Sequence, residues 1–243
     1  MLEVKNLTFQ VQENGVERSI VENISFDVAD GEMLVITGPN GGGKSTLAKV
    51  LMGIEKASAG QIILDGEDIS NYDINHRADA GIGYAFQQPP RFKGMTVMKL
   101  LSLSAGKELK REECCKLLST VGLCANEYIE REVDGTLSGG EMKRLEIATV
   151  LAKPHKVSIF DEPEAGIDLW SFSMLIKRFE EIHKEKKECL ILISHQERII
   201  QMADKIMVIE DGQVKEYGTK EDVLPTLFQQ KTGRMCGQEG GTC

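Results

Sequence analysis

A chain of 243 residues is long enough to bury a full hydrophobic core, and 29 Lys and Arg against 38 Asp and Glu leave a net charge of −9. This acidic balance counts against a general nucleic-acid-binding protein, which would present a basic face. No apolar run approaches the ~20 residues that a membrane-spanning helix needs, and the first residues lack the layout of a signal peptide. We therefore expect a cytoplasmic protein without direct membrane insertion and without a nucleic-acid partner.

The first part of the chain predicts antiparallel strands. Apolar and polar residues alternate over residues 2–11 and again over 20–28, which is the period of a half-buried strand. Asn14-Gly15 lies between these segments and is a typical hairpin turn. Residues 32–37 then predict a buried strand, and residues 61–67 predict a further short strand with its turn.

A glycine-rich loop directly follows the strand at residues 32–37. Its sequence is Gly38-Pro39-Asn40-Gly41-Gly42-Gly43-Lys44-Ser45-Thr46, which fits the pattern G-x-x-x-x-G-K-S/T. Glycines allow successive N–H groups to turn toward a phosphate without a Cβ in the way. Lys44 can reach the β- and γ-phosphate oxygens, and the Ser45 hydroxyl can contact Mg²⁺. Since residues 46–52 predict a helix whose N-terminus points at the loop, we expect a nucleoside triphosphate site here.

The chain becomes helical in character between about residues 88 and 151. Helix-spaced apolar residues occupy 96–103 and 110–121, and an amphipathic helix is predicted from 142 to 152. The segment before this last helix is Leu137-Ser138-Gly139-Gly140-Glu141, in which Ser138 and Glu141 have the spacing of a capping box. A capping box does not require two glycines, so Gly139 and Gly140 also predict exposed helix amides that form a second anion site.

Strand signals return at residues 156–161, 189–194 and 205–210, and Asp211-Gly212 predicts a closing hairpin. Continuous apolar strands separated by helices predict a parallel sheet covered on both faces. The first of these strands ends in two carboxylates. Asp161 suits a contact to Mg²⁺, directly or through a water, and Glu162 suits the general base that activates an attacking water.

Two other polar residues follow strand signals. Gln87 comes after residues 82–86, and its amide oxygen is expected to meet Mg²⁺ or the attacking water. His195 follows the strand that ends at Ser194, where open parallel sheets bind their ligands. Taken alone, Gln87 is better explained as an ordinary polar residue at a strand end, and a lone histidine is more often structural than catalytic.

The six cysteines show no spacing typical of a strong metal site. Four of them are expected to be reduced thiols, namely Cys114, Cys115, Cys124 and Cys189. Residues 229–243 predict a flexible Gly- and Cys-containing tail. Cys236 and Cys243 in this tail are candidates for holding a metal or a sulfur species, although two ligands alone are a weak indication of such a site.

In their order along the chain, these motifs resemble those of the ABC (ATP-binding cassette) ATPases. The matching segments are Gly38–Thr46 as Walker A, Gln87 as the Q-loop, Leu137–Glu141 as the signature, Val157–Glu162 as Walker B, Ala165–Asp168 as the D-loop and His195 as the switch histidine. The resemblance implies one ATP-binding domain over residues 1–228. Its fold is an α/β P-loop NTPase (RecA-like) core, with an N-terminal antiparallel β-subdomain and an inserted α-helical subdomain at about 88–151.

The resemblance also implies a mechanism. ATP bound to Gly38–Thr46 of one copy is covered by Ser138-Gly139-Gly140 of a second copy in a head-to-tail homodimer, with Asp168 of the D-loop at the same interface. Hydrolysis of Mg²⁺–ATP then opens the dimer. The implied catalytic residues are Lys44, Gln87, Glu162 and His195, and the implied metal contacts are Ser45, Gln87 and Asp161.

Three departures from the usual transporter pattern narrow the resemblance. Val11 stands where an aromatic residue would stack on adenine, Glu164 follows the Walker B proline, and residues 141–147 read Glu-x-Lys-Arg-x-Glu-Ile. Together they are similar to the SUF-type (SufC-like) iron–sulfur cluster assembly ATPase, which implies a soluble SufB-like scaffold as partner. The alternative is an ATP-binding subunit that energises a membrane transporter, with the permease on another chain and the protein peripheral to the membrane.

Overall fold

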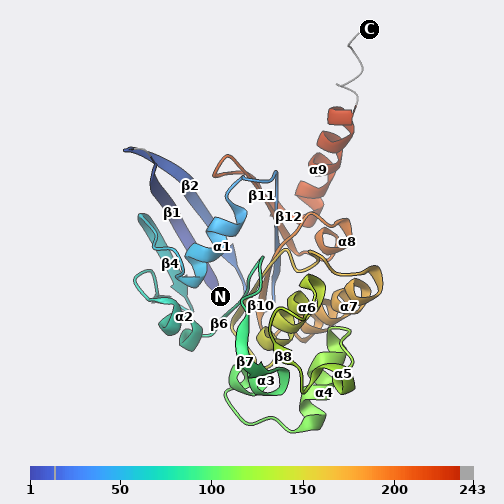
Figure 1. Cartoon of the computed structure of the whole chain (residues 1–243). Helices are drawn as coiled ribbons and strands as arrows, with labels where there is room; N and C mark the ends of the chain where they lie inside the picture. The colour runs from blue at the N-terminus through green and yellow to red at the C-terminus, as the bar shows by residue number, and fades with distance from the viewer. Residues whose placement is uncertain (14, 236–243) are drawn as a thin grey trace.

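The computed structural model describes residues 1–13 and 15–235, which form two large sheets with helices between and beside them (Figure 1). In chain order the elements are β1 (Leu2–Glu13), β2 (Val16–Val28), β3 (Met33–Thr37), α1 (Lys44–Met52), β4 (Ala59–Leu64), β5 (Glu67–Asp68), α2 (Ile74–Ala80), β6 (Ile82–Ala85), β7 (Phe92–Thr96), α3 (Val97–Ala105), α4 (Arg111–Thr120), α5 (Ala125–Tyr128), β8 (Glu132–Val133), α6 (Gly139–Val150), β9 (Val157–Asp161), α7 (Leu169–Glu185), β10 (Cys189–Ile193), α8 (Glu197–Ile200), β11 (Lys205–Glu210), β12 (Gln213–Thr219) and α9 (Lys220–Met235). Asn14 of the predicted Asn14-Gly15 turn, Cys236 and Cys243 lie outside the described residues.

The central sheet has the strand order β12-β11-β3-β10-β9-β6. Its strands are parallel except for β12, which pairs with β11 in antiparallel fashion after the Asp211-Gly212 turn. Successive residues of a strand enter opposite cores, so Met33 and Val35 pack with the α6 and α7 side, while Leu34 and Ile36 pack with the α1 side. The predicted parallel sheet with both faces covered is therefore confirmed.

The amino-terminal strands form a separate antiparallel sheet in the order β2-β1-β4-β5. Leu2 pairs with Val28 on one side and with Leu64 on the other. Its apolar residues share a core with helix α1 and with one face of the central sheet. This sheet is the N-terminal β-subdomain that the sequence predicts, and it buries α1 between two sheets.

The inserted lobe contains α3, α4, α5 and the start of α6, joined by the short antiparallel pair β7-β8. The sequence predicts only helices in this lobe; the pairing of Phe92 with Val133 is a non-local contact that no local pattern signals. Helix α9 continues through residues 229–235, so this part of the predicted flexible tail is helical instead. Within the described part of the chain, no helix combines the length and apolarity needed to cross a bilayer.

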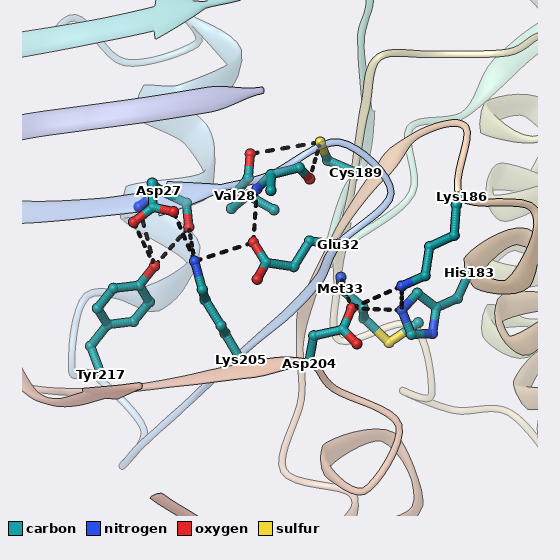
Figure 2. A network of polar contacts seen from close by, with 11 residues as sticks. Asp27, Val28, Glu32, Met33, His183, Lys186, Cys189, Asp204, Lys205 and Tyr217 are labelled. Carbon is teal, nitrogen blue, oxygen red and sulfur yellow. Dashed lines mark hydrogen bonds and ion pairs between the residues drawn. The ribbon is translucent and has the colours of Figure 1, made fainter. Parts of the chain in front are cut away.

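A polar network ties together the amino-terminal ends of the central strands (Figure 2). Lys205 of β11 lies 2.8 Å from an Asp27 carboxylate oxygen and 3.3 Å from a Glu32 carboxylate oxygen. Asp204 accepts a hydrogen bond of 2.9 Å from the Met33 N–H. These contacts fix one edge of the sheet, and the polar loops that follow β3, β6, β9 and β10 lie at the opposite edge.

Candidate active site

The glycine-rich loop connects β3 to α1 and is shaped by close backbone contacts. Gly38 has a φ of +127°, and a Cβ there would lie 2.0 Å from the Ile209 carbonyl oxygen, so only glycine fits. Lys44 is buried, and its ammonium donates hydrogen bonds of 2.8 Å to the carbonyls of Gly38 and Pro39. Burial lowers the pKa of Lys44, although the nearby Glu162 and Asp161 oppose this effect. The Gly38 and Pro39 carbonyls of the loop therefore hold the positively charged Lys44 ammonium in place.

Asp161, the last residue of β9, reaches the start of α1. The Ser45 hydroxyl donates a 3.0 Å hydrogen bond to one Asp161 carboxylate oxygen, and the Tyr84 hydroxyl lies 3.3 Å from the other. Asp161 is fully buried, and burial raises its pKa, while the Ser45 hydrogen bond and the Lys143 charge lower it. A buried carboxylate beside a hydroxyl is a pair of hard oxygen donors, which fits Mg²⁺.

Glu162 faces a different neighbour from Asp161. Its carboxylate accepts a 2.9 Å hydrogen bond from the Gln87 side-chain amide. Its backbone has a φ of +47°, which is unusual for a residue other than glycine, and its N–H donates to the Ile193 carbonyl at 3.0 Å. The two adjacent acids are thus directed to separate partners, Asp161 to the Ser45 hydroxyl and Glu162 to the Gln87 amide.

The phosphate loop, Gln87 and Glu162 surround one hollow of about 380 Å³ at the carboxyl edge of the sheet. Its walls are formed by Ile20, Asn40, Gly41, Gly43, Lys44, Ser45, Thr46, Gln87 and Glu162. The backbone brings together residues from four separate segments of the sequence. A cavity of this volume is within the range of small-molecule and cofactor sites.

The Ser138-Gly139-Gly140 segment begins α6 on the protein surface. Ser138 accepts a hydrogen bond from the Glu141 N–H at 3.3 Å, and the Ser138 N–H donates to the Glu141 carboxylate at 2.7 Å. The predicted capping box is therefore confirmed. A Cβ on Gly140 would lie 2.3 Å from the Gly166 carbonyl oxygen, whereas one on Gly139 would meet no atom within 4 Å. Packing inside the chain thus explains Gly140, and Gly139 is left exposed.

Three predicted site elements lie away from the hollow. Among the described residues that line it, none belongs to Ser138–Gly140, and neither Asp168 nor His195 takes part. His195 is exposed at the end of β10, and its backbone N–H donates to the Glu164 carboxylate. Asp168 caps α7 by accepting hydrogen bonds from the N–H groups of Trp170 and Ser171 at 3.1 and 3.0 Å.

Lys143 is a site neighbour to which the sequence reasoning gave no role of its own. It is buried on α6, and its ammonium donates hydrogen bonds to the carbonyls of Phe86 and Asp161. Glu146, one turn further along, accepts the Phe86 N–H at 2.8 Å and lies 3.8 Å from the Lys143 ammonium. Opposite charges three residues apart inside an apolar helical stripe are the sequence signal that would have identified this pair.

Comparison with known proteins agrees with this geometry. The model of the ABC transporter family matches residues 21–165, and the chain belongs to that family. It is an ABC ATPase, an enzyme that binds and hydrolyses ATP.

Individual relatives carry transporter names. The chain is 39% identical over 214 residues to an uncharacterized ABC transporter ATP-binding protein of Methanocaldococcus jannaschii, and covers 85% of each chain. It is 30% identical to the sulfate/thiosulfate import ATP-binding protein CysA 2 of Shewanella oneidensis, matching 85% of this chain but only 59% of the longer relative.

The fold also matches solved structures. A dimeric bacterial ABC transporter cassette has a TM-score of 0.83 at 20% identity, with 90% of this chain and 99% of that chain covered. A nucleotide-free cassette from an ABC transporter has a TM-score of 0.76 at 26% identity, with 94% and 95% covered. The predicted ABC ATP-binding fold is therefore confirmed, but neither named relative has a name from iron–sulfur cluster assembly.

Proposed function

We propose that the hollow holds Mg²⁺–ATP, with the phosphates on the loop Gly38–Thr46. The observation that carries this proposal is the meeting of the loop, Gln87 and Glu162 around one hollow at the carboxyl edge of the sheet. Lys44 supplies a positive charge for the β- and γ-phosphates, and the N-terminus of α1 adds backbone N–H donors. The absence of an aromatic side chain at Val11 leaves the phosphates to supply most of the affinity.

Ser45, Gln87 and Asp161 are the residues that would hold the magnesium ion. Mg²⁺ neutralises charge that develops on the phosphate oxygens during transfer. The Ser45 hydroxyl and the Asp161 carboxylate already lie 3.0 Å apart, and Gln87 lines the same hollow as Ser45. Asp161 would contact the magnesium ion either directly or through a water molecule.

Glu162 is our candidate for the general base that activates the attacking water. The Gln87 amide holds its carboxylate, which fixes the orientation of the acceptor oxygens. His195, at the end of the neighbouring strand β10, is the second candidate for a catalytic contact with the γ-phosphate. His195 is exposed and does not line the hollow, so we expect it to act from the rim of the nucleotide site.

A second copy of the chain would complete the site with Ser138-Gly139-Gly140. Ser138 and Gly139 are exposed, and the Ser138 oxygen accepts the capping hydrogen bond, so its own O–H hydrogen remains able to donate. Charge-assisted hydrogen bonds contribute about 1.5–3 kcal/mol each, so a few at each nucleotide would close a head-to-tail dimer. Hydrolysis then removes the ligand that joins the copies and opens them.

Sedimentation velocity of the Glu162→Gln variant with Mg²⁺–ATP tests this arrangement. We expect an ATP-dependent dimer, because nucleotide is bound but turned over slowly. Adding Ser138→Arg should leave ATP binding to the monomer intact and abolish the dimer. An undiminished ATP dimer in the double variant would remove this segment from the scheme.

Our first proposal for the partner is a membrane permease on another chain. The closing and opening of the dimer would change the conformation of this permease. The names of the relatives support it, since CysA 2 is an import ATP-binding protein. The chain would then sit at the cytoplasmic face of the transporter as a peripheral subunit.

The second candidate is a soluble SufB-like scaffold of iron–sulfur cluster assembly. The residues that depart from the transporter pattern favour this candidate. They include Glu164, Lys143 and Glu146, which make hydrogen bonds beside the candidate active site. Glu164 accepts a 2.6 Å hydrogen bond from Ser194, and Lys143 and Glu146 contact the backbone of Phe86 just before Gln87.

Affinity purification of the chain from its own cells, first without and then with detergent, distinguishes the two. A polytopic membrane protein that appears only in the detergent extract supports the permease. A soluble β-helical partner recovered without detergent supports the scaffold and contradicts the permease.

A further inference from the structure

Tyr84 places a hydroxyl group inside the core, beside the candidate active site. The residue is only 8% exposed and lies on β6, opposite Ile159 of the neighbouring parallel strand β9. Tyr84 and Ile159 pack in the core that contains α1, and Asp161, two residues after Ile159, is directed to the same face of the sheet. The strand pairing therefore brings the Tyr84 side chain to the carboxylate at the end of β9.

The two oxygens of the Asp161 carboxylate have separate hydroxyl donors. Oδ1 accepts a hydrogen bond from Ser45 at 3.0 Å, and Oδ2 accepts one from Tyr84 at 3.3 Å. A tyrosine hydroxyl keeps its proton at neutral pH, so it is available as a donor. Asp161 is fully buried, and a rotated carboxylate would leave an oxygen away from water without a donor, which is costly. The two hydroxyl groups together fix the orientation of this carboxylate.

Packing holds the Tyr84 ring in place. Its centroid lies 4.7 Å from that of the Phe86 ring at an interplanar angle of 76°, which is the edge-to-face geometry that aromatic pairs prefer. A phenylalanine in place of Tyr84 would keep this contact and nearly the same volume. What the tyrosine adds is one donor directed at Asp161.

Ser45 connects this pair of residues to the hollow. Ser45 lines the hollow, whereas the described lining residues include neither Asp161 nor Tyr84. Because the Ser45 hydroxyl hydrogen is donated to Asp161, the lone pairs of the Ser45 oxygen remain for a cation. The contacts run in order from Tyr84 to Asp161 to Ser45. Hydrogen-bond partners in such an outer position influence how tightly a site holds its metal.

We propose that Tyr84 is a positioning residue for the magnesium ion, because its hydroxyl holds the Asp161 carboxylate that orients the Ser45 hydroxyl. This inference rests on the proposed Mg²⁺–ATP site. Since Tyr84 does not line the hollow, it acts through Asp161 and not on the nucleotide itself. Removal of its hydroxyl should therefore weaken nucleotide binding only when Mg²⁺ is present.

The test measures how much Mg²⁺ strengthens nucleotide binding. Isothermal titration calorimetry with the hydrolysis-resistant analogue AMP-PNP gives one affinity in EDTA and one at saturating Mg²⁺. In Tyr84→Phe we expect the parent affinity in EDTA, and a ratio of the two affinities that falls by about 10-fold. This is the lower end of the effect of outer partners, because 3.3 Å is long for a hydrogen bond between two oxygens.

Tyr72→Phe is the matched control, since the Tyr72 hydroxyl donates to the Glu67 carboxylate and neither residue lines the hollow. It should keep the parent ratio. A second comparison places Tyr84→Phe in an Asp161→Asn background. If Tyr84 acts through the Asp161 carboxylate, its substitution should have no further effect on the ratio there.

Two results would overturn the proposal. One is the parent ratio in Tyr84→Phe, which can be read even if Asp161→Asn does not fold. The other is an equal loss from Tyr84→Phe with and without the Asp161 carboxylate. A parent chain whose affinity does not rise with Mg²⁺ would contradict the proposed metal site as a whole, whereas the first two results concern Tyr84 alone.

Discussion

The two glycine-containing segments of this chain, Gly38–Thr46 and Ser138–Gly140, differ in how the fold completes them. The first is enclosed by its own chain: Lys44 is buried, and the Ile209 carbonyl approaches Gly38 too closely for any side chain. The second lies on the surface, where Ser138 caps α6 and a Cβ added to Gly139 would meet no atom within 4 Å. Both present helix N-terminal amides, yet only the first lines the hollow that contains both Gln87 and Glu162, whereas Gly139 lines a different one.

This difference separates what one copy of the chain can do from what needs a partner. A loop enclosed by its own fold is preorganised for an anion, so its mutation should affect nucleotide binding directly. A capped but exposed segment is folded without being a complete site, so substitution of its exposed residues Ser138 and Gly139 should affect association, whereas Gly140 is packed against Gly166 within the same chain. The four predictions below use this contrast, in order of decreasing effect.

Lys44→Ala should have the largest effect. Because two or more charge-assisted hydrogen bonds to phosphate would be lost, at about 1.5–3 kcal/mol each, ATP affinity should fall by about 10²-fold or more. Isothermal titration calorimetry with Mg²⁺–ATP measures this. Lys49→Ala, on the same helix but outside the loop, is the control and should bind normally. A normal affinity in Lys44→Ala would contradict the assignment of the loop.

Glu162→Gln should bind ATP with nearly unchanged affinity but hydrolyse it about 10²-fold more slowly, as expected for the loss of a general base. The rate of phosphate release at saturating ATP is the measurement. If hydrolysis continues at the parent rate, the general base lies elsewhere, and His195 is the next residue to replace.

Gly140→Ala and Gly139→Ala form a matched pair within the surface segment. A Cβ at Gly140 would lie 2.3 Å from the Gly166 carbonyl, so overpacking should lower the free energy of unfolding by about 1–3 kcal/mol. Gly139→Ala meets no atom within 4 Å and should leave monomer stability nearly unchanged. Urea unfolding compares them, and equal stabilities would show that the D-loop does not constrain this helix.

Asp168→Ala should have the smallest effect. Asp168 caps α7 with two backbone hydrogen bonds, and loss of such a cap costs about 1 kcal/mol. Thermal unfolding of the monomer without nucleotide detects this cost. A much larger loss would mean that the 3.8 Å contact between Asp168 and Arg144 contributes more than an exposed ion pair usually does.

Local sequence patterns located most of the strands and the candidate site segments. Alternation of apolar and polar residues predicts β1 and β2, because one face of each strand is buried. Continuous apolar runs predict β3, β9, β10 and β11, because both faces of these strands are buried. The β7-β8 pair was missed, since two short polar-flanked segments pair only when the lobe has folded around them. Lys143 and Glu146 were read as family markers, and only the folded chain gives them contacts with Phe86 and Asp161.

The sequence by itself determined that a phosphate-binding loop follows a strand and opens a helix, because glycine, lysine and serine carry that chemistry in their spacing. Tertiary structure decided which distant residues complete it. The parallel order of β3, β10, β9 and β6 brings Gln87 and Glu162 to the loop, although even the nearer of the two, Gln87, lies 41 residues after Thr46 in the chain. Tertiary structure also buried Lys143 and Glu146, since hydrogen-bond partners and burial depend on packing between elements and not on local residue order.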